Sequence, residues 1–98
     1  MAITKTNPVA HQLAINLAGG AEVSFTFPQG TTAFSIISRT GVNYRVGFRA
    51  GDVTAGDYFL KTGSTEWYED CVMLMNNRRF WFTSDTAGGH NLDILTWQ

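Results

Sequence analysis

The sequence predicts an all-β fold: an antiparallel β-sandwich or small barrel of about eight short strands, with a jelly-roll-like arrangement. Apolar and polar residues alternate with a period of two along most of the 98 residues. Turn residues recur about every 8–12 positions, as they do in small sandwiches. Charged residues make up only 15% of the chain, whereas the aromatic residues that strands favour make up 13%.

The first half of the chain carries four segments that we expect to form strands. In the first, Leu13, Ile15 and Leu17 alternate with polar or small residues. Each segment ends near glycine or proline, which favour turns. The stretch Ala50–Gly56 has no periodicity and is expected to be a loop. The four expected strands cover residues 11–17, 23–27, 34–37 and 44–49.

The second half carries four more such segments and no helical period. Phe80 and Phe82 are expected to face the core, which turns Trp81 outward. By the same alternation, Leu92 and Ile94 are expected to point inward. The strands are expected at residues 58–61, 67–75, 79–83 and 92–95, separated by Thr62-Gly63-Ser64, Asn76-Asn77 and Ala87-Gly88-Gly89. The number of strands does not fix their order.

We expect one sandwich domain at residues 11–98, preceded by an N-terminal arm of residues 1–10 that could reach a neighbouring copy. The first residues lack the apolar region of a secretory signal, and no apolar run approaches the length of a membrane span. We therefore expect synthesis in a cytoplasm and no membrane partner. Cys71 lies in an apolar run, where a buried side chain is the expected state rather than a reactive thiol.

Composition argues against several functional classes. Seven basic and eight acidic residues nearly balance, which gives no electrostatic reason to expect nucleic acid. One cysteine and two histidines, His11 and His90, are too few for a zinc site. Asp52 and Asp57 are expected to form turns rather than to bind calcium. The sequence carries no motif of nucleophilic catalysis. We therefore expect no cofactor, no metal and no enzymatic activity.

Two features favour an interaction surface. Three arginines are expected around one hairpin, and arginine is well suited to interfaces because its planar fork binds carboxylates and stacks on aromatic rings. Several large apolar side chains are expected on outward faces that a small sandwich cannot cover, and such patches mark interfaces. We therefore expect a homo-oligomer, a dimer or trimer. The candidate interface residues are Arg39, Arg45, Arg49, Trp81, Leu95 and Trp97.

A pattern of aromatic, arginine and glycine residues extends over residues 32–97. It is carried by Phe34–Gly41, Tyr44–Arg49, Tyr58–Leu60, Trp67–Asp70, Phe80–Ser84 and Leu92–Trp97. This pattern resembles small β-rich virion proteins of tailed bacteriophages, such as capsid decoration (cement) proteins and small fibre or knob domains. The resemblance implies a structural protein of the virion, made in the bacterial host cytoplasm, that contacts itself and the major capsid protein. It implies no activity and no cofactor.

Two alternatives use the residues around position 67. A carbohydrate-binding module, or a fibre or knob domain that contacts host glycans, would use Trp67 and Tyr68 as a stacking platform. A small hydrolase would need two carboxylates across a cleft, and Glu66, Glu69 and Asp70 lie close by in the sequence. Glu69 and Asp70 are expected to point to opposite faces of a strand, which argues against the hydrolase.

Overall fold

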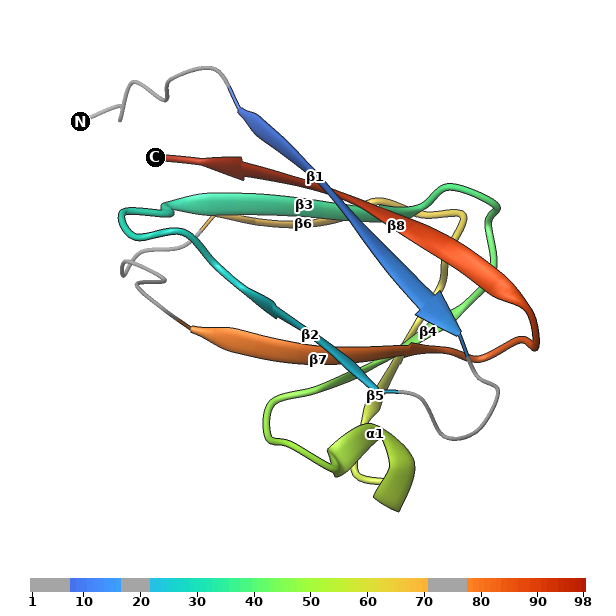
Figure 1. Cartoon of the computed structure of the whole chain (residues 1–98). Coiled ribbons are helices and arrows are strands. Elements are labelled where there is room, and N and C mark those ends of the chain that lie inside the picture. The colour runs from blue at the N-terminus through green and yellow to red at the C-terminus, as the bar shows by residue number, and fades with distance from the viewer. Residues whose placement is uncertain (1–7, 17–21, 71–77) are drawn as a thin grey trace.

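The computed structural model describes residues 8–16, 22–70 and 78–98. These residues form two four-stranded antiparallel sheets that stack face to face, with one short helix outside them (Figure 1). The first sheet contains, in spatial order, β1 (Val9–Asn16), β8 (Gly89–Trp97), β3 (Ala33–Ser38) and β6 (Trp67–Asp70). The second contains β2 (Val23–Thr26), β7 (Arg79–Ser84), β4 (Tyr44–Gly47) and β5 (Phe59–Lys61). The predicted all-β sandwich is confirmed.

The strands pair in a nested order. In the second sheet β4 pairs with β5 and β2 with β7, and in the first sheet β3 pairs with β6 and β1 with β8. Successive pairs therefore alternate between the two sheets, as if a long antiparallel ribbon had been rolled up. Eight strands paired in this way form a jelly roll. The topology supplies the strand order that the strand count left open.

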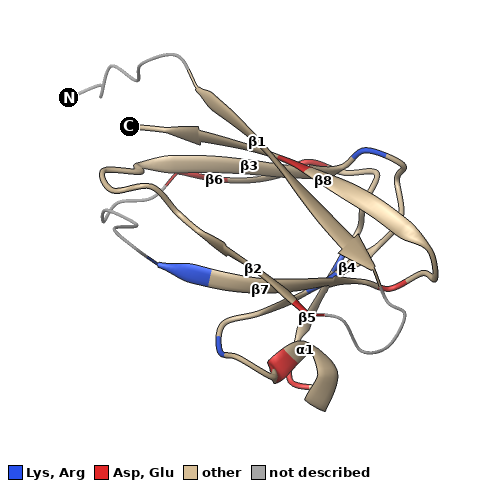
Figure 2. Cartoon of the chain, in the orientation of Figure 1, with Lys and Arg blue, Asp and Glu red and all other residues tan. Residues whose placement is uncertain are grey.

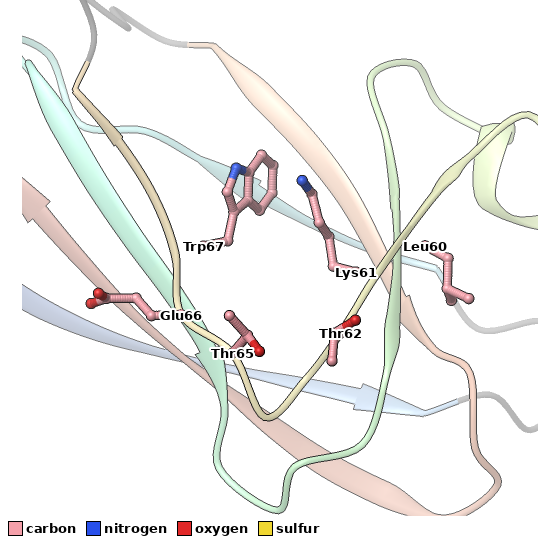
Figure 3. A pocket seen from close by; sticks show the side chains of 6 residues that line it. All are labelled: Leu60, Lys61, Thr62, Thr65, Glu66 and Trp67. Carbon is pink, nitrogen blue, oxygen red and sulfur yellow. The ribbon is translucent and has the colours of Figure 1, made fainter.

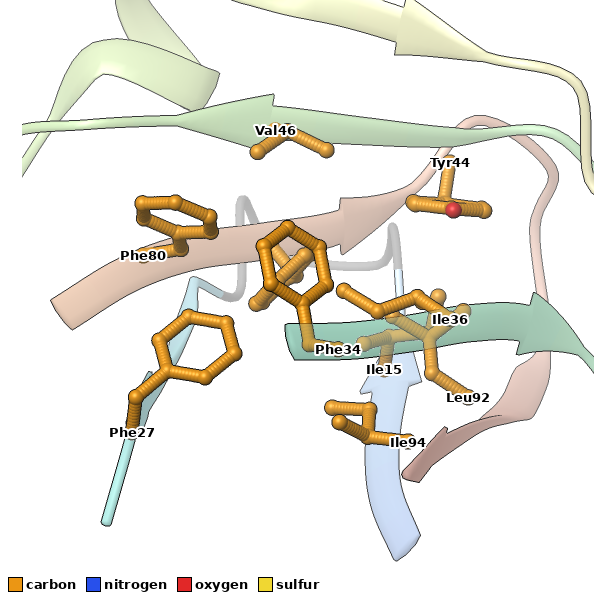
Figure 4. Packing of buried hydrophobic residues seen from close by; sticks show 10 residues of the cluster. Ile15, Phe27, Phe34, Ile36, Tyr44, Val46, Phe80, Leu92 and Ile94 are labelled. Carbon is orange, nitrogen blue, oxygen red and sulfur yellow. The ribbon is translucent and has the colours of Figure 1, made fainter. Parts of the chain in front are cut away.

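The core lies between the sheets, where alternate residues of each strand point inward. Leu92, Ile94 and Phe80 are buried, as the period-two pattern predicts. At one end the rings of Phe27 and Phe34 lie 4.9 Å apart, and Phe27 lies 5.0 Å from Phe80 (Figure 4). Each large apolar side chain that is fully buried contributes roughly 1.5–3 kcal/mol to folding. The buried cluster comprises Ile15, Phe27, Phe34, Ile36, Tyr44, Val46, Phe80, Phe82, Leu92 and Ile94.

The stretch expected to be a loop contains a short helix, α1 (Asp52–Ala55), so that prediction was wrong. The Glu22 carboxylate accepts a hydrogen bond from the Gly51 amide at 2.8 Å and holds the start of the helix. The helix packs on the outer face of the second sheet, where Gly47 of β4 leaves room for it. A Cβ at Gly47 would lie 2.8 Å from the Cβ of the first helical residue. Val53 is fully buried in this contact.

Several strand and segment boundaries in the structure differ from those that the sequence predicted. Val9 and Ala10 belong to β1, so the expected arm of residues 1–10 loses its last two residues to the sandwich; residues 1–7 lie outside the described part. β4 ends at Gly47 rather than at residue 49 because the chain turns there toward α1. β6 is described as far as Asp70, and the rest of the strand expected to end at residue 75 lies outside the described part, as does Cys71.

Candidate interaction surfaces

The three predicted interface arginines do not surround one hairpin, as the sequence suggested. β3 and β4 belong to different sheets, and the turn after β3 carries the chain across the sandwich. Arg49 also lies beyond the end of β4, so it does not share a strand face with Arg45. Each arginine instead has its own carboxylate partner. The ion pairs are Arg39–Asp93 at 2.7 Å, Arg45–Asp85 at 2.8 Å and Arg49–Asp52 at 3.7 Å.

These ion pairs differ in how tightly they hold the guanidinium groups. Arg39 binds Asp93 through two nitrogens, and this hydrogen-bonded contact raises the pKa of Arg39, which stays charged. Arg45 is largely covered and also lies over the Tyr58 ring, 4.8 Å from its centroid. Arg49 is 81% exposed, and its ion-pair contact is the longest of the three. Among the described arginines of this set, Arg49 is therefore the most accessible to a partner.

The three outward apolar residues take the faces that the alternation predicts, but none is fully exposed. Trp81 lies opposite Gly47 in the second sheet, on the face that α1 covers, and Arg79 lies over its ring at 6.0 Å. Trp97 contacts the Tyr68 ring edge-on at 5.8 Å on the outer face of the first sheet. Leu95 is half-buried on that same face. Their role in an interface stays a prediction.

A more exposed apolar patch lies elsewhere, on and beside β5. Phe48 and Phe59 lie together on one face of the sheet edge, and Leu60 points to the opposite face; 46%, 61% and 54% of their surface is exposed. The Phe48 ring lies 5.6 Å from the Phe59 ring and 4.9 Å from the buried Phe80 ring. This patch was not predicted, because Phe48 was expected to lie within a strand at residues 44–49, whereas β4 ends at Gly47. The run Tyr58-Phe59-Leu60, apolar on both strand faces, was the available signal.

A pocket of about 280 Å³ lies beside this patch, where the chain passes from β5 to β6 (Figure 3). Its volume is at the lower end of the range for small-molecule sites, about 300–1,000 Å³. The Lys61 ammonium lies over the Trp67 ring at 4.2 Å, Thr62 and Thr65 line the part near the turn, and the Glu66 side chain points away from the ring. The lining residues are Leu60, Lys61, Thr62, Thr65, Glu66 and Trp67.

The two residues of the predicted glycan platform point to opposite faces of β6. Trp67 packs inward: its ring lies parallel to the Phe80 ring at 6.1 Å, and Lys61 covers another part of it. Tyr68 faces outward beside Trp97 and is 44% exposed. They therefore do not form one continuous platform, and Trp67 alone belongs to the pocket.

The carboxylates considered for hydrolysis are also dispersed. Glu66 accepts a hydrogen bond from the Ser35 hydroxyl at 2.5 Å. Glu69 accepts one from the Trp67 indole nitrogen at 3.0 Å, and Asp70 follows it on the opposite strand face. Of the three, only Glu66 lines the pocket. The sequence neighbours thus do not form a pair of facing carboxylates at the pocket.

The histidines lie apart from one another and from the pocket. His11 contacts Thr96 at 3.1 Å and the edge of the Phe25 ring, and burial lowers the pKa of its imidazole. His90 lies beside the Thr40 hydroxyl at 2.9 Å. Within residues 8–16, 22–70 and 78–98 there is no group of three or more side chains that could hold a metal ion, and no helix that could cross a membrane.

Charge is sparse over the described surface. Figure 2 shows acidic and basic residues scattered mainly at strand ends and in loops, while long parts of both sheets carry neither. Over the whole sequence, seven basic residues nearly balance eight acidic ones. The features available to a partner are therefore the β5 patch, the adjoining pocket and the outer face of the first sheet. Comparisons with family models, with curated proteins and with solved structures found no match.

Proposed function

We propose that the protein is a non-enzymatic structural component that works as a homo-oligomer, and that it serves as a capsid decoration (cement) protein of a bacteriophage virion. The observation that carries the self-association is the β5 patch, Phe48, Phe59 and Leu60, with about half of each side chain exposed. Exposed apolar side chains gathered at one sheet edge favour a protein contact.

The assignment to a virion rests on two supports. The resemblance to small phage virion proteins is one, and the jelly-roll topology, which many capsid domains share, is the other. The topology is a support by analogy, because one fold hosts many functions. A cement protein stabilises a shell by binding the assembled state in preference to free subunits. It needs one surface for its own copies and another for the shell, and Trp97 and Leu95 on the first sheet suit the second role.

Two measurements test this proposal. Sedimentation equilibrium over a wide concentration range is expected to give a dimer or trimer. Co-sedimentation with empty shells of a bacteriophage major capsid protein is expected to retain the protein on the shells. Trp97→Ala is expected to weaken shell binding without unfolding the domain. A protein that is monomeric at high concentration and does not bind the shells contradicts the proposal.

The pocket supports a second candidate, a carbohydrate-binding module. Sugar sites combine an aromatic ring with polar partners, and the pocket is lined by the Trp67 ring and by the hydroxyl-bearing residues Thr62 and Thr65. A sugar could stack on the ring only where Lys61 moves aside, and an exposed cation–π contact of this kind is worth about 0.5–1 kcal/mol. Glycan-array binding that is lost in Trp67→Ala and retained in Tyr68→Ala would favour this candidate. No binding on the array would exclude it for the glycans displayed.

A further inference from the structure

We propose that the free edge of β5 pairs with β5 of a second copy, antiparallel and centred on Phe59, and joins two copies into one continuous eight-stranded sheet. This inference rests on the proposed self-association and identifies its surface. β5 is the last strand of the order β2-β7-β4-β5, so among residues 8–16, 22–70 and 78–98 only one of its edges is paired, with β4. An edge strand whose outer edge is unpaired is a template for another strand.

The side chains at this edge are complementary to the same side chains of a second copy in an antiparallel arrangement. Lys61 is the last residue of β5, two positions after Phe59, and Asp57 lies just before the strand, two positions before Phe59, so the pairing extends β5 to Asp57. In an antiparallel pair centred on Phe59, each Asp57 is therefore opposite Lys61 of the second copy, and the two Phe59 rings are opposite each other. Opposite charges and aromatic pairs at facing positions stabilise antiparallel strands. Asp57 is exposed and Lys61 is half-buried.

The two charges are accessible for such a contact. Lys61 has its ammonium on the Trp67 ring, a cation–π contact that leaves the charge without a carboxylate in the described ion pairs. In β6, the edge strand of the first sheet, the charged residues Glu69 and Asp70 have the same sign. A second copy of β6 would therefore bring no opposite charge. At the β5 edge, by contrast, a second copy places a negative side chain opposite a positive one.

The exposed area is also of the right order. An aromatic side chain presents roughly 200 Å², so Phe48 and Phe59 at about half exposure, with Leu60, leave about 300 Å² of apolar surface per copy. Two copies expose about 600 Å² in this way, on both faces of the joined sheet. Full coverage of that area, with apolar atoms at about 60% of a typical interface, gives a contact of about 1,000 Å², which is the lower limit of stable interfaces.

Reversing the charges tests the register directly. Asp57→Lys and Lys61→Asp are each expected to raise the dimer dissociation constant about tenfold or more, because each places like charges at two facing positions. The double variant Asp57→Lys/Lys61→Asp restores opposite charges and is expected to return within about threefold of the wild type. Circular dichroism checks that each variant is folded, since Lys61→Asp also removes the contact with Trp67.

Cross-linking provides a second test that does not depend on these charges. Facing residues of antiparallel strands have Cα atoms about 4.5–5.5 Å apart, which is within the range that a disulfide can span. Phe59→Cys is expected to form a disulfide-linked dimer under mild oxidation. Val9→Cys, at a similarly exposed apolar residue on the edge of β1, is the matched control and is expected to form much less. The wild type controls for Cys71.

The outcomes separate this inference from the proposed function. A wild type that stays monomeric overturns both. A wild type that self-associates, with charge reversals that neither weaken nor restore it, overturns the β5 pairing and leaves self-association in place. Preferential cross-linking through Val9→Cys instead of Phe59→Cys would assign the contact to β1 and overturn the β5 pairing.

Discussion

Replacing Gly63 with alanine tests how the turn between β5 and β6 is held. Gly63 is buried, and a Cβ added to it would lie 1.7 Å from the carbonyl oxygen of Val42. Side-chain Cβ atoms essentially never approach another heavy atom within 3.0 Å, so the backbone must move by more than an ångström. That movement breaks two hydrogen bonds: Gly63 N–H to the Asn43 side chain at 3.1 Å, and Ser38 N–H to the Gly63 carbonyl at 3.2 Å.

The expected cost follows from these contacts. Two hydrogen bonds contribute about 1 kcal/mol each, and forcing extra volume into a packed site costs about 1–3 kcal/mol. Gly63→Ala should therefore lower the free energy of unfolding by about 3–5 kcal/mol, a large part of the stability of a small domain. In a domain of this size that loss lowers the Tm by about 12 °C or more.

The measurement is urea denaturation followed by tryptophan fluorescence, with thermal melting as a second readout. Gly89→Ala is the matched control, because nothing lies within 4 Å of a Cβ added there and its φ is not in the left-handed region. The control should stay within about 0.5 kcal/mol of the wild type. A loss below about 1 kcal/mol in Gly63→Ala would refute the close packing of this turn.

Two further predictions concern titratable groups, the buried Tyr44 and the half-buried His11. The Tyr44 hydroxyl is buried and has no hydrogen-bond partner among the described residues, and burial raises its pKa well above the ordinary value of about 10. Because Tyr44 ionises first in the unfolded chain, the free energy of unfolding should fall as pH rises above about 10. In alkaline urea titrations Tyr44→Phe should remove that fall, while its stability at neutral pH should be equal to that of the wild type or about 1 kcal/mol higher. A clear loss of stability at neutral pH would contradict this prediction. Burial lowers the pKa of His11, so stability should fall as pH drops below about 6.5, where the unfolded chain takes up the proton first. His11→Gln should reduce this acid dependence, and an unchanged pH profile would exclude the effect.

The strands could be predicted because the alternation of apolar and polar residues reflects which side chains face the core and which face solvent. Ile36, Phe82 and Ile94 each belong to a series in which every second residue is apolar, and each is fully buried. The order of the strands could not be predicted, since a turn signal is the same for a hairpin and for a crossing between sheets. The turn at Arg39-Thr40-Gly41 was interpreted as a hairpin and instead crosses the sandwich.

The candidate surfaces were harder to predict than the fold. Trp81 was assigned correctly to an outward face, but α1, whose four residues are too few to show a helical period, lies on that face. Phe48 was expected within the strand at residues 44–49, on the same face as Val46, but the strand ends between them and Phe48 is 46% exposed. The alternation of inward and outward side chains continues only within a strand. Where a strand ends depends on packing, which cannot be deduced from a single sequence.

The nested pairing of the jelly roll has a consequence for how the chain folds. Partners become more distant with each successive pair, and His11 meets Thr96, a residue 85 positions away. Loop closure makes such distant contacts slow to form, so we expect β4 and β5 to associate first and β1 to dock last. β8 lies between β1 and β3, so the first sheet stays divided until β8 has been synthesised. During synthesis on a ribosome, β1 therefore spends the longest time without its partner β8, and its apolar residues stay accessible to other nascent chains.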